Sequence, residues 1–336
     1  MGKMKHHLTL IRPYGMLFLG FTPVFCAIVN GEFSFQHLAI LYFIGILAHI
    51  FGFAQNDYFD LKIDSKSKYV AKRPIVTGKI SRKTALIIFA FSFILSLVLA
   101  IVFVFSLYSF IFLLITFLLF TLYNKYSKRF FGMEYILGAG VFTFGIFGAL
   151  TVSNNVSSFA IIISAVGFMQ WLFSVGISAN LKDVEFDAKH GIRTTPSIFG
   201  VKAIGQKLMI PKSFWIYAFS IKIIHILIIS LPFIFGYSSI FIYDLPIPGI
   251  GFLLITILLL FITYKILVTP MSKRDDMLVN VGLQEGMALL LFLIVLLDLF
   301  IENIGMITFY LLIILFIVWP LFWLRLLYGE RMIPLE

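Results

Sequence analysis

The sequence predicts an all-α, polytopic membrane protein whose helices form one bundle. Of its 336 residues, 61% are hydrophobic and only 12% are charged, and the apolar segments follow one another with short gaps. Soluble domains carry about 25% charged residues. Because no linker rich in Pro, Gly or Ser divides the chain, we expect a single transmembrane domain over residues 1–336.

Ten apolar runs have roughly the length of a membrane span, which needs about 20 residues. They lie at 14–30, 37–55, 85–106, 108–123, 132–151, 158–178, 214–235, 249–268, 280–301 and 305–325. The first run follows basic residues but contains no small-residue cleavage pattern, so we expect an uncleaved helix. The only cysteine, Cys26, lies in that run, and a disulfide within the chain is therefore excluded.

The distribution of basic residues predicts the orientation of the bundle. Of 26 Lys and Arg residues, 25 lie in the N-terminal tail, in alternate connections or near the C-terminus, all on one side of a ten-span topology. The connections on the other side contain no Lys or Arg, and only Lys222, inside the run 214–235, departs from this pattern. By the positive-inside rule we expect a protein of the cell membrane with both termini cytoplasmic. The net charge of +10 therefore does not indicate a nucleic-acid partner.

Two cytoplasmic connections are long and hold six of the 16 acidic residues. Long loops between closely spaced helices usually carry function. In the first, Asn56, Asp60 and Asp64 recur every four residues directly after the second run. If the helix continues, these residues form one polar stripe that can hold a cation.

The second long connection repeats this pattern. Asn180, Asp183 and Asp187 follow the sixth run at spacings that again place them on one face of a continuing helix. An alternative is that both groups are ordinary solvated helix ends, with acids and bases paired for solubility. Their occurrence on the same predicted face, each followed by Arg and Pro, favours a shared site.

The chemistry of these side chains indicates a magnesium site. Neither group contains His or Cys, and carboxylate and amide oxygens suit a hard cation. Mg²⁺ is usually held by few carboxylates together with substrate phosphates. A divalent ion also removes the repulsion between grouped carboxylates, while nearby Lys and Arg can bind phosphate oxygens. We therefore expect a diphosphate substrate.

These residues resemble the motifs of the UbiA superfamily of intramembrane prenyltransferases. The first motif, Asn-Asp-x-x-Asp-x-x-x-Asp, is matched by Asn56, Asp57, Asp60 and Asp64. The second, Asp-x-x-x-Asp, is matched by Asp183 and Asp187. Residues 72–81 and 191–196 also resemble segments that follow the two motifs, and the similarity in motif order covers at least residues 8–200.

The resemblance implies a bundle with a central cavity that opens to lipid and is capped by two cytoplasmic Asp-rich loops. The usual bundle has nine helices, so the segment 305–325 is a possible additional helix. The resemblance also implies that Mg²⁺ ions hold a prenyl diphosphate between the loops. The metal-binding residues would be Asn56, Asp60, Asp64, Asp183 and Asp187.

Further roles follow from the same resemblance. Asp60 and Asp183 are catalytic candidates, and Tyr123 is a candidate for stabilising a cation or contacting phosphate. Substrate-binding and supporting roles would fall to Lys72, Arg73, Arg193, Asn180 and Asp57. Arg12 receives no catalytic role, because the Asn usual shortly after its Arg-Pro pair is absent.

The expected reaction is transfer of a prenyl chain from its diphosphate to a lipophilic acceptor taken from the membrane lipid. The loop 56–81 resembles most the archaeal ether-lipid branch, in which geranylgeranyl is joined to geranylgeranylglyceryl phosphate. An aromatic quinone precursor, chlorophyllide or a carotenoid remain alternative acceptors. A cation-coupled transporter is the rival from another class, since carboxylates at membrane helix ends also form ion sites. The roles of Lys222, Glu285 and Asp298 stay open.

Overall fold

The computed structural model describes residues 2–205 and 207–334, and most of this part of the chain is helical. Within it, ten helices are long and apolar enough to cross a membrane, judged by length and composition. They correspond in order to the ten runs read from the sequence, which confirms the polytopic all-α fold class. The chain is an integral, multi-pass membrane protein.

The structure divides into two compact units, which are described separately. Unit 1 comprises Met1–Ser127, Ala139–Ala160 and Leu315–Glu336. Unit 2 comprises Lys128–Gly138 and Ile161–Ile314. The single transmembrane domain expected from the sequence stays a prediction.

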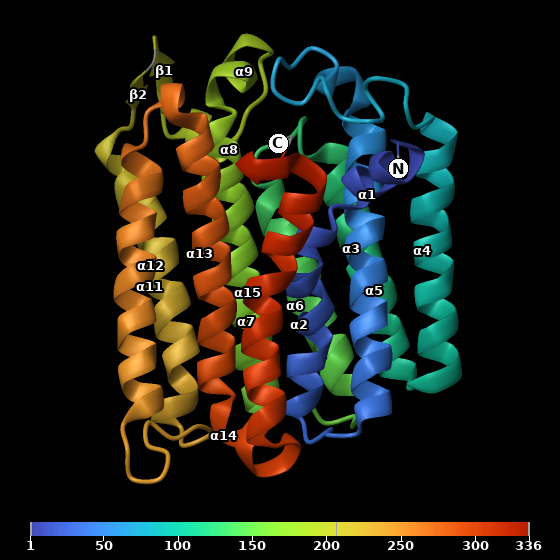
Figure 1. Ribbon diagram of the computed structural model, residues 1–336, viewed down its shortest axis with the longest axis vertical. Coiled ribbons are helices and arrows are strands. Elements are labelled where there is room, and N and C mark those ends of the chain that lie inside the picture. The colour runs from blue at the N-terminus through green and yellow to red at the C-terminus, as the bar shows by residue number, and fades with distance from the viewer. Residues whose placement is uncertain (1, 206, 335–336) are drawn as a thin grey trace. The chain divides into compact units, whose positions relative to one another are not determined.

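Unit 1 is built around one long helix, α3 (Figure 1). Its complete helices are α1 (Gly2–Ile11), α2 (Met16–Ile28), α3 (Phe35–Asp64), α4 (Arg82–Phe103) and α5 (Leu107–Tyr126). Most of α6 (Met133–Leu150) and part of α15 (Met306–Tyr328) also belong to it. α2 approaches α3 closely through Gly45, where an added Cβ would lie 2.5 Å from the carbonyl oxygen of Leu19.

The length of α3 positions the first acidic cluster. Its 30 residues extend about 45 Å at roughly 1.5 Å per residue, which exceeds the ~30 Å hydrocarbon core of a bilayer. The helix continues without interruption through Asp64, as the spacing of the polar residues predicted. The last turns of α3 can therefore extend beyond the hydrocarbon core.

The beginning of the chain differs from the sequence-based expectation of a tail before residue 14. Gly2–Ile11 form a helix, and the chain then turns at Arg12, whose φ of 47° is left-handed. Pro13 lacks an N–H and disfavours helical backbone at the preceding residue, which explains the break. A search for apolar runs does not detect α1, because its first residues are basic and polar.

Unit 2 contains the second acidic cluster and four long helices. Its elements are α7 (Ser158–Phe173, shared with unit 1 at its first residues), the π-helix η2 (Ser174–Ala179), α8 (Asn180–Lys182), α9 (Val184–Lys189), α10 (Thr195–Ile198), β1 (Lys202–Ile204), β2 (Lys207–Met209), α11 (Lys212–Ile234), α12 (Ile247–Val268), η3 (Met271–Lys273), α13 (Arg274–Val295), α14 (Leu297–Leu299) and η4 (Phe300–Ile304). β1 and β2 pair antiparallel, with Ala203 opposite Leu208.

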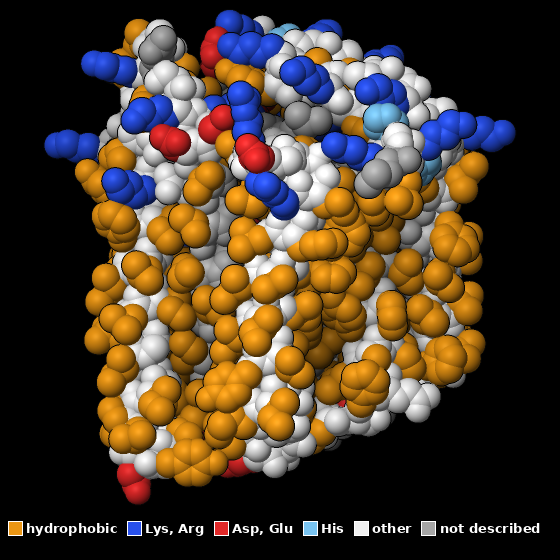
Figure 2. Space-filling view, in the orientation of Figure 1, with side chains coloured by type: hydrophobic (Ala, Val, Ile, Leu, Met, Phe, Trp, Pro, Cys, Tyr) orange, Lys and Arg blue, Asp and Glu red, His pale blue; other side chains and the backbone are white. Residues whose placement is uncertain are grey.

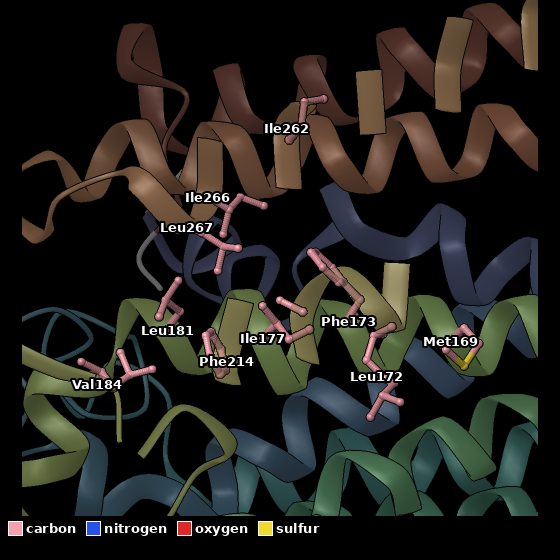
Figure 3. Packing of buried hydrophobic residues seen from close by; sticks show 13 residues of the cluster. Met169, Leu172, Phe173, Ile177, Leu181, Val184, Phe214, Ile262, Ile266 and Leu267 are labelled. Atoms are coloured by element: carbon pink, nitrogen blue, oxygen red, sulfur yellow. The ribbon is translucent and has the colours of Figure 1, made fainter. Parts of the chain in front are cut away.

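A buried apolar cluster fixes the end of α7 that carries these acids (Figure 3). Phe173 and Ile177 contribute from α7 and η2, Phe214 from α11, and Ile266 from α12, and each is fully buried. Leu181 extends the cluster to the short helix α8. Burial of a large apolar side chain stabilises the fold by about 1.5–3 kcal/mol. The acidic segment is therefore held next to a well-packed apolar cluster.

The ninth span is displaced from its predicted place at 280–301. α13 begins at Arg274 and ends at Val295, and it is followed by the short elements α14 and η4. Its first turn is polar, with Arg274, Asp275 and Asp276, so the apolar run in the sequence begins after the start of the helix. As a result, Arg274 belongs to the membrane helix and not to the preceding loop.

The surface is that of a protein surrounded by lipid. Figure 2 shows hydrophobic side chains along the long helices, while Lys and Arg gather at one end of the helices of each unit. In unit 1, Phe91 and Ile94 of α4 are 61% and 58% exposed. In unit 2, Ile216 of α11 and Leu254 of α12 are similarly exposed. Such faces are stable only when acyl chains cover them.

Candidate active site: two carboxylate clusters

The first cluster lies in the last turns of α3. Asp57, Asp60 and Asp64 are all buried, with exposed fractions of 1%, 6% and 6%. Asn56 donates a hydrogen bond from Nδ2 to Oδ2 of Asp60 over 3.3 Å. Three buried carboxylates within eight residues repel one another unless cations compensate them.

Two arginines supply that compensation for Asp57 and Asp64. Arg73, from the loop after α3, donates from Nη1 to Oδ2 of Asp64 at 2.7 Å and to Oδ1 of Asp57 at 3.2 Å. Arg12 donates from Nη2 to Oδ1 of Asp57 at 2.9 Å. A guanidinium in this position has the geometry to bind phosphate oxygens as well as carboxylates.

Arg12, which received no catalytic role from the sequence, contacts the first cluster and is held by several interactions. Its side chain is 6% exposed, and its guanidinium carbon lies 4.6 Å from the centre of the Phe53 ring. His49 forms hydrogen bonds through Nε2 with the carbonyl oxygens of Ile11 and Arg12, at 3.1 Å each. The turn before α2 therefore places Arg12 on Asp57.

The end of α5 is hydrogen-bonded to α3 next to the first cluster. Asn124 donates from Nδ2 to the carbonyl oxygen of Gly52 and to Oε1 of Gln55, both at 3.0 Å. Tyr123, the predicted cation-stabilising residue, is half-buried beside Asn124, and Lys72, a predicted diphosphate ligand, is exposed. The structure brings Asp57, Asp64 and Arg73 together, while Lys72 remains at the surface.

The second cluster does not continue a regular helix, contrary to the single stripe that the sequence predicted. The π-helix η2 widens the end of α7, and Asp183 interrupts the helix with φ −107° and ψ 3°. π-Helical turns occur frequently at functional sites. Asn180 and Asp183 are half-buried, whereas Asp187 is fully buried.

Both oxygens of Asp183 are paired with cations. Lys182 donates from Nζ to Oδ2 at 2.9 Å, and Arg274 donates from Nη2 to Oδ1 at 2.8 Å. Arg274 also donates from Nη1 to the carbonyl oxygen of Lys182. Burial acts to raise the pKa of Asp183, but the charges of Lys182, Arg274 and Lys128 outweigh it and hold that pKa well below its usual value.

Asp187 is in the opposite situation. Its side chain is fully buried, and neither carboxylate oxygen has a hydrogen-bond partner. Burial raises the pKa of Asp187 to about 6, against the lowering effect of the Lys128 charge. A buried carboxylate without partners is costly, and a bound cation would remove that cost.

These carboxylates are better suited to bind Mg²⁺ together with substrate phosphates than to form a complete metal site by themselves. Among residues 2–205 and 207–334, no three His, Cys, Asp or Glu side chains are grouped closely enough to hold a metal ion by themselves. Mg²⁺ does not require such a group, because it keeps several waters and is commonly held by one or two carboxylates plus substrate phosphates. The unpartnered oxygens of Asp187 are therefore suitable ligands.

The segment after the second motif is anchored by a residue that the sequence argument missed. Glu134, in the first turn of α6, is 5% exposed and accepts a hydrogen bond from the hydroxyl of Thr195. η2 can pass close to Glu134 because residue 176 is glycine, where an added Cβ would lie 3.0 Å from Cγ of Glu134. Arg193, a predicted diphosphate ligand, is exposed two residues before Thr195.

Arg274 and Lys128 were also missed as site residues. Arg274 contributed to the sequence analysis only as part of the basic charge on the cytoplasmic side. Lys128 lies in the basic segment after Tyr123, which resembles a family segment, but it was assigned no site role. Lys128 precedes α6, and its charge acts on Asp183 and Asp187. A basic residue next to a span was the available signal, but it is shared by many residues that only set topology.

The arrangement can be compared with known proteins. The model of the UbiA prenyltransferase family matches residues 17–279. The chain is 26% identical over 296 residues to a digeranylgeranylglyceryl phosphate synthase of Methanococcus maripaludis, covering 87% of this chain and 98% of that protein. It is 27% identical over 175 residues to a 4-hydroxybenzoate octaprenyltransferase of Pseudomonas fluorescens, covering 51% of this chain and 57% of that protein.

Solved structures show the same fold. A digeranylgeranylglyceryl phosphate synthase structure aligns with a TM-score of 0.61 and 23% identity, covering 87% of this chain and 98% of that one. A UbiA homolog from Archaeoglobus fulgidus bound to DMAPP and Mg²⁺ aligns with a TM-score of 0.57 and 19% identity, covering 85% and 98%. Because the family model spans most of the sequence, the chain belongs to the UbiA prenyltransferase family.

Proposed function

We propose that this chain transfers a prenyl group, geranylgeranyl in the first instance, from its diphosphate to a lipophilic acceptor in the bilayer, and that the transfer requires Mg²⁺. The observation that carries the proposal is a pair of carboxylate clusters in which basic side chains contact the acids. The acids at the end of α3 are all buried, and Asp187 is buried in the cluster after α7. Simple solvation of helix ends does not require burial of the acids.

The proposed metal ligands are Asn56, Asp60, Asp64, Asp183 and Asp187. The buried, unpartnered oxygens of Asp187 and the buried carboxylate of Asp60 support this assignment. Bound Mg²⁺ would supply charge neutralisation for the departing diphosphate. Arg73, Lys72 and Arg193 would bind the diphosphate oxygens, with Asp57 and Asn180 in support.

The chemistry of the transfer then follows from charge. The allylic C–O bond breaks, and the diphosphate leaves with the electron pair while the cationic side chains stabilise its charge. The allyl cation that remains is attacked by a nucleophilic atom of the acceptor, which loses a proton. Tyr123 would stabilise this cation through its ring face, and apolar surroundings would exclude water.

We propose geranylgeranylglyceryl phosphate as the acceptor. Support comes from the relatives named digeranylgeranylglyceryl phosphate synthase, one of which aligns over 98% of its length. The 4-hydroxybenzoate octaprenyltransferase of Pseudomonas fluorescens aligns over 57% of its length. This shorter alignment supports the second candidate function, prenylation of an aromatic quinone precursor. Chlorophyllide and a carotenoid are the remaining alternative acceptors.

We further propose that both carboxylate clusters and both termini face the cytoplasm of the cell membrane. In unit 1, the described N-terminal and C-terminal segments lie at the same end of the helices as the end of α3, which supports an even number of spans (Figure 1). The orientation can be tested by introducing a cysteine at the exposed Ser153, since the native Cys26 is buried. Labelling from the external side of intact cells is expected, and labelling only from the cytoplasmic side would contradict the topology.

The function is tested by mass spectrometry on the purified protein with geranylgeranyl diphosphate and a panel of acceptors, in Mg²⁺ and in excess EDTA. The expected product is the digeranylgeranyl ether of glyceryl phosphate, formed only with Mg²⁺. A prenylated aromatic acid instead would favour the second candidate. Ion transport by reconstituted vesicles without product from any acceptor would favour a transporter and overturn the proposal.

A further inference from the structure

The contacts of Arg274 differ from those expected of a residue that only anchors a helix. It comes from the first turn of α13, 91 residues beyond Asp183, and its side chain is 9% exposed. One nitrogen of its guanidinium donates to a carboxylate oxygen of Asp183, and the other donates to the carbonyl oxygen of Lys182. The fork of Arg274 is thus directed at a proposed metal ligand from outside the two family motifs.

Asp183 and Asp187 are unequal as metal ligands in this state. Both oxygens of Asp183 are occupied, by Arg274 at 2.8 Å and by Lys182 at 2.9 Å. Neither oxygen of Asp187 has a hydrogen-bond partner. A divalent ion can therefore be bound by Asp187 without breaking a contact, whereas binding by Asp183 requires that at least one basic side chain moves away.

We propose that Arg274 is the exchangeable counterion of Asp183: it occupies this ligand in the unloaded protein and transfers to a diphosphate oxygen when Mg²⁺ and prenyl diphosphate bind together. The inference deepens the proposed function and rests on it. A buried guanidinium without an anionic partner is strongly unfavourable. When Asp183 turns to the metal ion, Arg274 therefore needs a new acceptor, and a diphosphate oxygen offers the charge and geometry that arginine binds well.

This exchange couples the two ligands. To reach Asp183, Mg²⁺ alone would have to displace Arg274 without providing it with a new anion. In the absence of the diphosphate the metal ion is therefore held by Asp187 without Asp183, and it binds weakly. The complex of Mg²⁺ with prenyl diphosphate provides both a cation for Asp183 and an anion for Arg274. Coordination of the metal ion by both acids of the second cluster therefore awaits the donor substrate.

Arg274 is better suited to this exchange than Lys182. Lys182 adjoins Asp183 in the chain, so it stays near the carboxylate whatever α13 does. Arg274 belongs to another helix and presents several donors in a rigid fork, whereas an ammonium group is a point charge. The charge of Lys182 can thus remain on Asp183 while the fork of Arg274 turns to a phosphate oxygen.

The test compares Arg274→Gln with Lys273→Gln in the full-length protein, since Lys273 is an exposed basic neighbour with the same charge. Calorimetry would measure the Kd of Mg²⁺ alone, and then the Kd of a non-reactive geranylgeranyl thiodiphosphate in saturating Mg²⁺. We expect Arg274→Gln to bind Mg²⁺ alone at least about fivefold more tightly and the analogue at least about tenfold more weakly, because hydrogen bonds to charged groups contribute this much. Lys273→Gln should match the wild type in both.

Tighter binding of Mg²⁺ together with weaker binding of the analogue distinguishes this exchange from a structural role. Loss of a structural role would weaken the binding of both ligands. Arg274→Lys serves as a second variant that keeps the charge and should recover most of the analogue affinity if Arg274→Gln is unstable. If both Arg274 variants bound Mg²⁺ alone no more tightly than the wild type, while the wild type bound the analogue in Mg²⁺, the inference would be overturned and the proposed function would stand. If the wild type itself bound no analogue in Mg²⁺, the proposed function would fail, and the inference with it.

Discussion

Nη1 of Arg73 lies 2.7 Å from Oδ2 of Asp64, so the loop after α3 folds back onto the last turn of that helix. The same nitrogen lies 3.2 Å from Oδ1 of Asp57. One guanidinium therefore bridges two acids of the first cluster, seven positions apart in the sequence. This contact links the substrate-binding and metal-binding roles proposed for the loop and the helix.

The first prediction concerns Arg73. Arg73→Gln removes the charge that bridges Asp57 and Asp64 and would bind the diphosphate, so the Kd of geranylgeranyl thiodiphosphate in Mg²⁺ should rise by about 10- to 100-fold. Calorimetry measures this change. Lys79→Gln, an exposed charge in the same loop, is the control and should leave the Kd within about twofold. Equal effects of both substitutions would mean that only the net charge of the loop matters.

The second prediction contrasts the two acids of the second cluster by their stability without metal. Asp183→Asn leaves Arg274 and Lys182 buried without their shared anion, a change that typically costs about 3–5 kcal/mol. Asp187→Asn removes a buried carboxylate that has no hydrogen-bond partner, so at neutral pH it should leave the stability unchanged or raise it.

Thermal unfolding in detergent and EDTA measures this contrast. The Tm of Asp183→Asn should fall by several degrees, and that of Asp187→Asn should equal or exceed the wild-type value. A larger loss in Asp187→Asn would show that its carboxylate has partners in the metal-free protein.

The third prediction is a pH dependence of Mg²⁺ binding. Because the pKa of Asp187 is raised to about 6, its carboxyl is ionised at pH 7.5 and largely protonated at pH 5. A metal ion must then displace a proton, so its affinity should fall as the pH falls through 6, by up to about tenfold per pH unit. Asp183, with its lowered pKa, stays ionised throughout this range.

The sign for stability is opposite. The folded protein without metal holds the proton of Asp187 more tightly than the unfolded chain, in which the pKa of Asp is near its usual value of 3.8. The contribution of Asp187 to stability is therefore present below about pH 4 and is lost as the pH rises through 6. Mg²⁺ titrations between pH 5 and 7.5 on the wild type and Asp187→Asn test the predicted fall in Mg²⁺ affinity. A wild-type affinity that does not change with pH would contradict the assignment.

The fourth prediction concerns the buried amine of Lys222, whose role the sequence left open. Its Nζ lies 3.3 Å from Oε1 of Gln170, 3.4 Å from Nδ1 of His225 and 3.9 Å from the centre of the Phe173 ring. Gln284 donates to the same Gln170 oxygen at 3.0 Å. This network joins α7, α11 and α13 within unit 2.

Removing the amine should be less harmful than removing its acceptor. Lys222→Met keeps the volume and removes the buried charge, and Oε1 of Gln170 still accepts from Gln284, so the change should stay within about 1 kcal/mol or stabilise. Gln170→Leu leaves the amine with fewer partners and should cost about 2–4 kcal/mol. Chemical unfolding in detergent compares the two. A greater loss in Lys222→Met would mean that the amine itself holds the helices together.

The parts of the site that the sequence could predict are those encoded by local spacing. Asn56, Asp60 and Asp64 recur with the helical period, and the continuation of α3 through Asp64 follows from that pattern. The pairing of Arg274 with Asp183 could not be predicted in the same way, because 91 residues separate them and no local pattern records which basic residue reaches which acid.

The break at Asp183 was missed for a related reason. The spacing of Asn180, Asp183 and Asp187 suits a regular helix, but Glu134 and the apolar cluster around Ile177 act on the preceding turn from distant segments. Packing of this kind overrides local periodicity. The burial of Asp187 is likewise a property of the tertiary fold and cannot be read from the acidic motif alone.

The central claim, that both carboxylate clusters serve one magnesium-dependent transfer, is tested most directly by the turnover of Asp60→Asn and Asp187→Asn. Each removes one ligand charge from a different cluster and keeps the side-chain size. Asp275→Asn, an exposed acid in the first turn of α13, is the matched control.

The measurement is product formation from geranylgeranyl diphosphate and geranylgeranylglyceryl phosphate by well-folded protein in saturating Mg²⁺. We predict a loss of at least about 100-fold for Asp60→Asn and for Asp187→Asn, because the charge that develops on the diphosphate is no longer stabilised. Asp275→Asn should retain wild-type turnover. Near-normal turnover in either cluster variant would contradict the account.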